Sequence, residues 1–148
     1  MSQTSTTNIT VTAVNDAPTA TNLNAAETYI EDTALNLTDI VVSDVDSATV
    51  TATLILSNAA AGSLNTATSG AITSTYNSST GVWKANGAVS DINVLLAGLT
   101  FTPSANFNSN FAINTSITDG IAVTSGTKTM TGTAVNDAPV IANLESTT

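Results

Sequence analysis

Asp44 and Asp46 form an Asp-x-Asp pair, in which two carboxylates one residue apart can approach the same ion. Carboxylate, amide and backbone oxygens are the ligands of calcium, which takes about six to eight of them. Further acidic and amide side chains stand beside turn signals or in a repeated linker, where they could converge with this pair. The candidate metal ligands are Asn15, Asp16, Glu31, Asp44, Asp46, Asp119, Asn136 and Asp137.

The charge balance favours a cation as ligand and argues against anionic partners. The 148 residues include eleven acidic side chains and two cationic ones, for a formal net charge of −9. Nucleic acid and anionic lipid require cations, so neither is an expected partner. No apolar run is long enough for direct membrane insertion. The absence of cysteine excludes disulfides and thiolate metal sites.

A plainer interpretation of the acidic residues stays open. Aspartate favours turns, so Asp46 and Asp119 can be turn residues without an ion, and Glu31 can simply solvate a loop. Three further carboxylates are interpreted as solvated side chains or helix caps and not as ligands: Asp32, Asp39 and Asp91.

The sequence gives little support for catalysis. It has no histidine or cysteine, and Lys84 and Lys128 lie within strand patterns. Two carboxylates about 5–9.5 Å apart can cleave glycosides, but such a cleft also uses aromatic and basic residues, which are scarce in this chain. We therefore expect no enzymatic activity. The single tryptophan, Trp83, is expected in the core and not at a sugar-stacking site.

The elements that position the acidic residues are predicted to be strands. Apolar and polar residues alternate over 50–56 and 111–117, and the Val- and Thr-rich composition suits a pleated surface. Other strands are predicted over 35–42, 71–76, 99–103 and 127–135, and from 82 onward. A short helix is predicted with Ser90 as its N-cap and Gly98 at its end.

These elements predict an all-β fold, a seven-stranded Greek-key β-sandwich with one short helix. Successive turns of a sandwich lie at alternating poles. Carboxylates that are distant in the sequence can therefore meet at one pole.

An internal repeat defines the domain organisation. Thr12–Pro18 recurs unchanged as Thr133–Pro139, 121 positions later (133 minus 12), which predicts tandem domains of that period. Residues 1–17 are assigned to the last strand and linker of a preceding repeat, 18–137 to the sandwich repeat, and 138–148 to the start of the following repeat. The expected partners are neighbouring repeats of the same chain, and this fragment alone is expected to be monomeric. The strand pattern over 10–12 would lack its partners and is expected to fray or to dock non-natively.

Four short motifs, in chain order, resemble motifs of cadherins. Val14–Pro18 resembles the cadherin linker, Ile30–Asp32 its glutamate motif, Val42–Asp46 its DxD motif, and Thr118–Gly120 the aspartate before its last strand. Their order and rough spacing match over nearly the whole chain. The resemblance implies a cadherin-like or Ig-like sandwich with Ca²⁺ at the junctions between repeats.

Two longer stretches, Glu31–Leu35 and Asp91–Pro103, are similar to the cadherin-like repeats of giant bacterial adhesins, including RTX-type adhesins. This resemblance implies many tandem copies, export by type I secretion and an extracellular location at the bacterial surface. The linker departs from the cadherin motif at Ala13 and Ala17, and a DRE motif is missing. We therefore expect about one or two ions per junction.

The resemblance also implies two groups of ligands, with Asp16 facing the preceding repeat. The group expected at the N-terminal pole is Asn15, Asp44, Asp46 and Asp119. The group expected at the C-terminal pole contains Glu31 and Asp137 but lacks the DxD pair of the next repeat. We expect the first group to bind calcium well and the second weakly.

The expected function is mechanical. The repeat would be a calcium-binding structural extender of a large secreted adhesin, stiffened at its junctions, and it would project an adhesive tip for cell adhesion and biofilm formation. Two alternatives stay open: a carbohydrate- or surface-binding module, and a homophilic cadherin-like adhesion domain.

Overall fold

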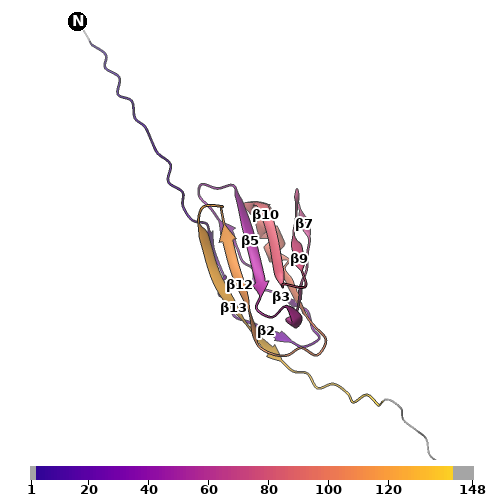
Figure 1. The fold of residues 1–148 in the computed structure, drawn as a ribbon. Helices are drawn as coiled ribbons and strands as arrows, with labels where there is room; N and C mark the ends of the chain where they lie inside the picture. Colours follow the sequence, from indigo (N-terminus) through magenta and orange to yellow (C-terminus); the bar gives the residue numbers. More distant parts are fainter. Residues whose placement is uncertain (1–2, 142–148) are drawn as a thin grey trace, which may run out of the picture.

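The two cleanest alternating patterns form central strands of a mostly β fold in the computed structural model, which describes residues 3–141. Every second residue of β5 (Thr49–Leu56) and of β12 (Phe111–Thr118) is buried, and the two strands are antiparallel neighbours. One α-helix and several sheets complete the fold, which is consistent with the predicted all-β sandwich (Figure 1).

The largest sheet has six strands. In spatial order they are β2 (Glu27–Ile30), β13 (Val123–Thr133), β12, β5, β10 (Val82–Ala88) and β9 (Thr75–Asn77). β2 runs parallel to β13, whereas the other neighbours are antiparallel. β2 and β13, the first and last of these strands along the chain, are therefore paired at one edge of the sheet.

Smaller sheets complete the β-structure. The three-stranded sheet contains β3 (Leu35–Asn36), β11 (Thr100–Pro103) and β6 (Gly62–Leu64), with β11 in the middle. The two-stranded sheets pair β1 (Thr19–Ala20) with β4 (Val42–Ser43) and β7 (Thr68–Ser69) with β8 (Ile72–Thr73). A short 3-10 helix, η1, covers Ala59–Ala61.

The single strand predicted over 35–42 is wrong, because β3 ends at Asn36 and β4 begins at Val42. Thr38 accounts for the interruption. Its backbone N–H and its hydroxyl both donate to the carboxylate of Glu27, at 2.8 and 3.2 Å, so this N–H is not available to a β-ladder.

Helix α1 (Val89–Ala97) begins one residue before the predicted cap Ser90, so that prediction is wrong. The capping position is Ala88, whose methyl group cannot accept a hydrogen bond. The N–H of Val89 donates instead to the carbonyl of Ala48 at 3.0 Å, so the first turn is bound to the start of β5. The helix ends at Gly98, as predicted. None of the described helices has the length and apolarity needed to cross a membrane.

The core lies between the sheets and under the helix. Trp83 on β10 is 1% exposed, and its indole N–H donates to the carbonyl of Asn65 at 3.0 Å, which confirms its predicted core position. Leu95 and Leu96 of α1 are buried as well. The helical spacing that interrupts the strand pattern is therefore a packing feature.

The chain enters the sandwich at one end and leaves it at the opposite end (Figure 1). From residue 3 to residue 18 the described chain forms no strand, in agreement with the expected loss of structure over 10–12. The final strand, predicted over 127–135, begins earlier and ends at Thr133. Its early start follows from the tight turn at Asp119, after which β13 pairs with β12 from Val123 onward.

Candidate metal centre

Three predicted ligands meet where the chain enters the sandwich. Asp44 and Asp46 follow β4, and Asp119 follows β12, yet each has a carboxylate oxygen within 4.8 Å of the others. Asp44 and Asp119 are half-buried, and Asp46 is exposed. We call these three residues the N-terminal cluster.

Backbone N–H groups hold two of these carboxylates in place. Oδ1 of Asp44 accepts from the N–H groups of Asp46 and Ser47, at 3.0 and 2.8 Å. Oδ1 of Asp119 accepts from the N–H groups of Ile121 and Ala122, both at 2.8 Å. Each aspartate thus fixes its own turn, which leaves the other oxygen to face the cluster.

Gly120 makes the Asp119 turn possible. Its φ of +97° is a backbone conformation that residues with a Cβ rarely adopt. No heavy atom lies within 4 Å of the position that a Cβ would take, among the residues described. The requirement for glycine is therefore conformational and not one of space.

The linker binds directly to the N-terminal cluster. Asn15 Nδ2 donates to Oδ2 of Asp119 at 2.8 Å, and the N–H of Asp16 donates to Oδ2 of Asp46 at 2.9 Å. In this arrangement Asn15 acts as a donor, and a 180° turn of its amide would present Oδ1 to an ion instead. The linker therefore contacts two of the three carboxylates, which joins the chain entry to the site.

The electrostatics keep these carboxylates ionised. Burial and the nearby charge of Asp119 raise the pKa of Asp44, but the N–H groups of Asp46 and Ser47 outweigh both, so the pKa lies below its ordinary value. The pKa of Asp119 is lowered by the N–H of Ala122 first, then by the amide of Asn15. Both groups are therefore anionic at neutral pH.

One oxygen of the N-terminal cluster is left without a partner. Oδ2 of Asp44 is buried and accepts no hydrogen bond from any residue between 3 and 141. A buried anionic oxygen is costly unless something pairs with it. A cation bound among the three carboxylates would supply that partner.

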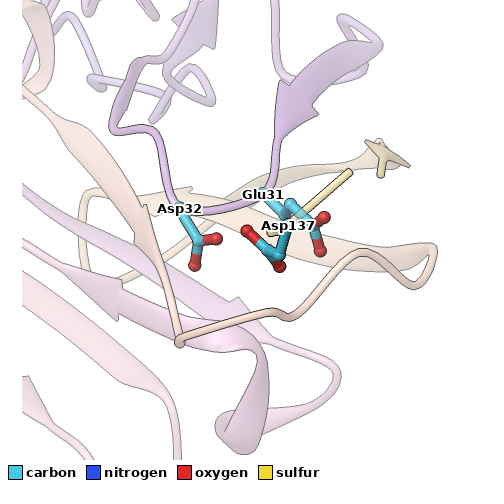
Figure 2. Close-up of side chains that lie close together, drawn as sticks. All are labelled: Glu31, Asp32 and Asp137. Carbon is cyan, nitrogen blue, oxygen red and sulfur yellow. The ribbon is translucent and has the colours of Figure 1, made fainter. Parts of the chain in front are cut away.

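A second cluster lies where the chain leaves the sandwich. Figure 2 shows Glu31, Asp32 and Asp137 side by side, and each has an oxygen within 4.8 Å of the others. Glu31 is 4% exposed, whereas Asp32 and Asp137 are exposed. We call these residues the C-terminal cluster.

Neighbouring donors already occupy much of the C-terminal cluster. The carboxylate of Glu31 accepts from Asn108 Nδ2 at 2.8 Å and, through its other oxygen, from the N–H of Val135 at 2.5 Å. Oδ1 of Asp32 accepts from the N–H of Asn106 at 2.8 Å. Glu31 therefore anchors the outgoing linker, as Asp46 and Asp119 anchor the incoming one.

The predicted ligands divide into three sets. The sandwich brings Asp44, Asp46 and Asp119 together with the Asn15 side chain at one pole, and Glu31 with Asp137 at the other. Asp16 approaches its cluster through its N–H only, and Asn136 is exposed without a hydrogen bond to the described part of the chain. Asp32 joins the C-terminal cluster although it was interpreted as a solvated residue. Its place next to Glu31 in the sequence was the one feature that could have indicated membership of this cluster.

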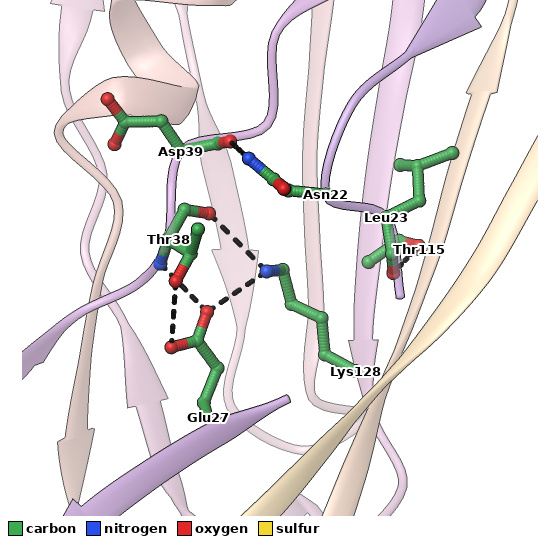
Figure 3. Close-up of polar contacts among 7 residues, drawn as sticks. All are labelled: Asn22, Leu23, Glu27, Thr38, Asp39, Thr115 and Lys128. Carbon is green, nitrogen blue, oxygen red and sulfur yellow. Dashed lines mark hydrogen bonds and ion pairs between the residues drawn. The ribbon is translucent and has the colours of Figure 1, made fainter. Parts of the chain in front are cut away.

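Sequence reasoning also missed a buried ion pair away from both clusters. Lys128 Nζ lies 3.0 Å from the carboxylate of Glu27 and also donates to the carbonyl of Thr38 at 3.3 Å (Figure 3). Lys128 is 0% exposed and Glu27 is 7% exposed. This pair joins β2, β13 and the segment between β3 and β4.

The two lysines do not neutralise either cluster. Lys128 is used by Glu27, and that contact is the only ion pair between described residues. The other lysine, Lys84, is exposed on β10. No described lysine therefore pairs with a carboxylate of either cluster, and a hard cation such as Ca²⁺ prefers carboxylate oxygens as ligands. No protein-family model matches the chain, and a search of curated proteins finds no match.

Proposed function

We propose that this chain is a calcium-binding structural extender repeat of a large, secreted bacterial surface adhesin. The observation that carries the proposal is the buried, unpartnered Oδ2 of Asp44 within three carboxylates that the incoming linker contacts. An ion at this point would bind the sandwich and the linker together.

Calcium is the ion that best suits the available ligands. Both clusters offer oxygen only, and the sequence has no histidine or cysteine to favour zinc or copper. The ligands come from separate turns and from the linker, which suits the irregular shell of calcium, whereas magnesium requires a small, strictly octahedral shell. Asp44 and Asp46 with Asp119 and an amide oxygen of Asn15 would form one shell, completed by water.

The proposed role is to limit bending at the junction between repeats. Asn15 and the N–H of Asp16 already bind the linker to the N-terminal cluster. An ion shared by the same carboxylates would add to these contacts and restrict the linker further. Repeats stiffened in this way would hold an adhesive tip away from the cell. The proposed location is extracellular, at the bacterial surface, after type I secretion.

The finer fold assignment belongs to the same proposal. The order β2-β13-β12-β5 in one sheet and β3-β11-β6 in the other corresponds to seven strands of a cadherin-like Greek key, with β9 and β10 as additions. The parallel pairing of β2 with β13 supports it, because the first and last strands of such a sandwich lie side by side. The sequence motifs at both poles agree with this order.

A glycan-binding role has weaker support. A shallow hollow of about 360 Å³ lies beside β10 and is lined by Thr73, Thr75, Lys84 and Asn86 among others. These side chains can bond sugar hydroxyls, but the lining contains no aromatic ring on which a sugar could stack. The extender function is therefore preferred.

Calcium titration of the folded chain tests the proposal. Isothermal titration and thermal melting with calcium or EGTA should show binding and a higher Tm in calcium. The Asp44→Ala/Asp46→Ala variant should lose most of both effects. Asp39→Asn is the matched control, because Asp39 is exposed and lies outside both clusters. Equal melting of the parent chain in calcium and EGTA would reject the proposal.

A further inference from the structure

The two copies of the repeated segment occupy opposite poles, and they use different atoms there. At the entry, the side chain of Asn15, the N–H of Asp16 and the carbonyl of Pro18 contact the sandwich. The last of these accepts from the hydroxyl of Thr124 on β13. These three groups belong to the second half of the repeated segment.

At the exit, the contacts come from other positions. The carbonyl of Thr133 accepts from the N–H of Glu31 at 3.0 Å, and the N–H of Val135 donates to the Glu31 carboxylate. The carboxylate of Asp137 lies beside those of Glu31 and Asp32. These groups come from the first half of the segment and from one side chain of its second half.

Within residues 3–141, no group of the repeated segment is used at both poles. Asn15 corresponds to Asn136, and Asp16 to Asp137 (each 121 positions later). The asparagine side chain is used at the entry only. The aspartate contributes its N–H at the entry and its carboxylate at the exit. One copy of the segment can therefore bind two sandwiches at the same time.

We propose that the N-terminal pole is the docking surface for the outgoing linker of the preceding copy of this domain. In that junction Asn136, the N–H of Asp137 and the carbonyl of Pro139 bind the following copy, while Val135 and the Asp137 carboxylate stay on this one. The inference rests on the tandem arrangement in the proposed function, but its attractive contacts are hydrogen bonds between protein groups, so it can be tested separately from ion binding.

The docking brings exposed apolar side chains of two poles together. Val135, which binds this copy, and Asn136, which would bind the following copy, are consecutive residues. Their Cα atoms are about 3.8 Å apart, so the two poles must lie close together. Val45 and Ile121 at the N-terminal pole are 81% and 79% exposed, and Ile30 at the exit is 47% exposed. A following copy docked at this distance would cover some of these exposed apolar side chains.

A two-repeat chain tests the inference directly. Residues 1–139 followed by residues 19–148 reproduce the natural period, because Thr133–Pro139 is identical to Thr12–Pro18. ¹⁵N relaxation should show both repeats tumbling as one body, in EGTA as well as in calcium. Asn136→Ala should separate their tumbling and lower the Tm of the second repeat as much as Asn15→Ala lowers that of the single 148-residue chain.

Two further variants separate docking from folding. Asn136→Ala in the single chain should leave the Tm unchanged, because the residue is exposed there without a partner in the described chain. Val45→Ser/Ile121→Ser in the second repeat should loosen the junction without unfolding either repeat. Independent tumbling of the parent in EGTA, with coupling only in calcium, would overturn this inference and leave the calcium proposal intact. Coupled tumbling of a chain that binds no calcium would support this inference and reject the calcium proposal.

Discussion

Replacing Lys128 by methionine removes the cation that pairs with the buried carboxylate of Glu27. Lys128 is 0% exposed and lies 3.0 Å from Glu27, which is itself 7% exposed. Methionine fills a similar volume, so packing is largely kept, but Glu27 remains buried without its counter-ion. Breaking a buried pair on one side costs about 3–5 kcal/mol. We expect Lys128→Met to lower the free energy of unfolding by that amount.

The double variant Glu27→Gln/Lys128→Met tests the reason for that loss. Thr38 now donates from its N–H and its hydroxyl to different oxygens of Glu27, at 2.8 and 3.2 Å. The amide oxygen of a neutral glutamine can still accept from the N–H, and its NH₂ group can donate to the hydroxyl oxygen. Replacement of both charges of a buried pair is often close to neutral. The double variant should therefore recover at least half of the loss.

Urea unfolding at neutral pH measures both variants, with Lys84→Met as the control. Lys84 is exposed on β10, and its substitution should change stability by less than about 0.5 kcal/mol. A loss below about 1 kcal/mol for Lys128→Met would contradict the stated burial cost. A double variant as unstable as the single one would show that lysine packing, and not the stranded charge, causes the loss.

Four further results are expected from the two clusters. The pKa values of Asp44 and Asp119 lie below the ordinary 3.8, so both ionised carboxylates stabilise the ion-free fold above pH 3.8. Thermal melts should show this stability being lost as the pH falls through the lowered pKa values. For the same reason calcium affinity, measured by titration, should be nearly constant from neutral pH to about pH 5. Gly120→Ala should destabilise the Asp119 turn by about 1 kcal/mol in urea unfolding, because of its φ of +97°. Asp32→Asn should leave the stronger calcium site unchanged in a titration and weaken only a second, weaker one, whereas loss of the stronger site would contradict the separation of the clusters.

The alternating turns of a sandwich allowed distant carboxylates to converge, and the resemblance to cadherin motifs assigned Asp44, Asp46 and Asp119 to the same pole. Local chemistry then fixed the details, since both half-buried aspartates accept hydrogen bonds from N–H groups of their own turns. Asp32 was missed because its orientation depends on a positive φ of 61° and on the N–H of Asn106, which is 74 residues away in the chain.

The buried ion pair was not predictable for a related reason. Lys128 and Glu27 are 101 residues apart. A single charge in an alternating strand normally indicates a solvent-facing position. Only the parallel pairing of β2 with β13 brings the two side chains to the same buried place. Contacts of this kind depend on topology, which a single strand pattern does not contain.

The two clusters differ in what an ion would replace. At the exit, the buried Glu31 already has a donor on each oxygen, so an ion there must compete with Asn108 and Val135. At the entry, a buried oxygen of Asp44 has no donor from residues 3–141, and its turn is fixed independently by two N–H groups. An ion at the entry therefore gains a partner for a stranded charge without breaking the turn that orients it. This difference in cost, more than the number of carboxylates, makes the N-terminal cluster the stronger candidate for calcium.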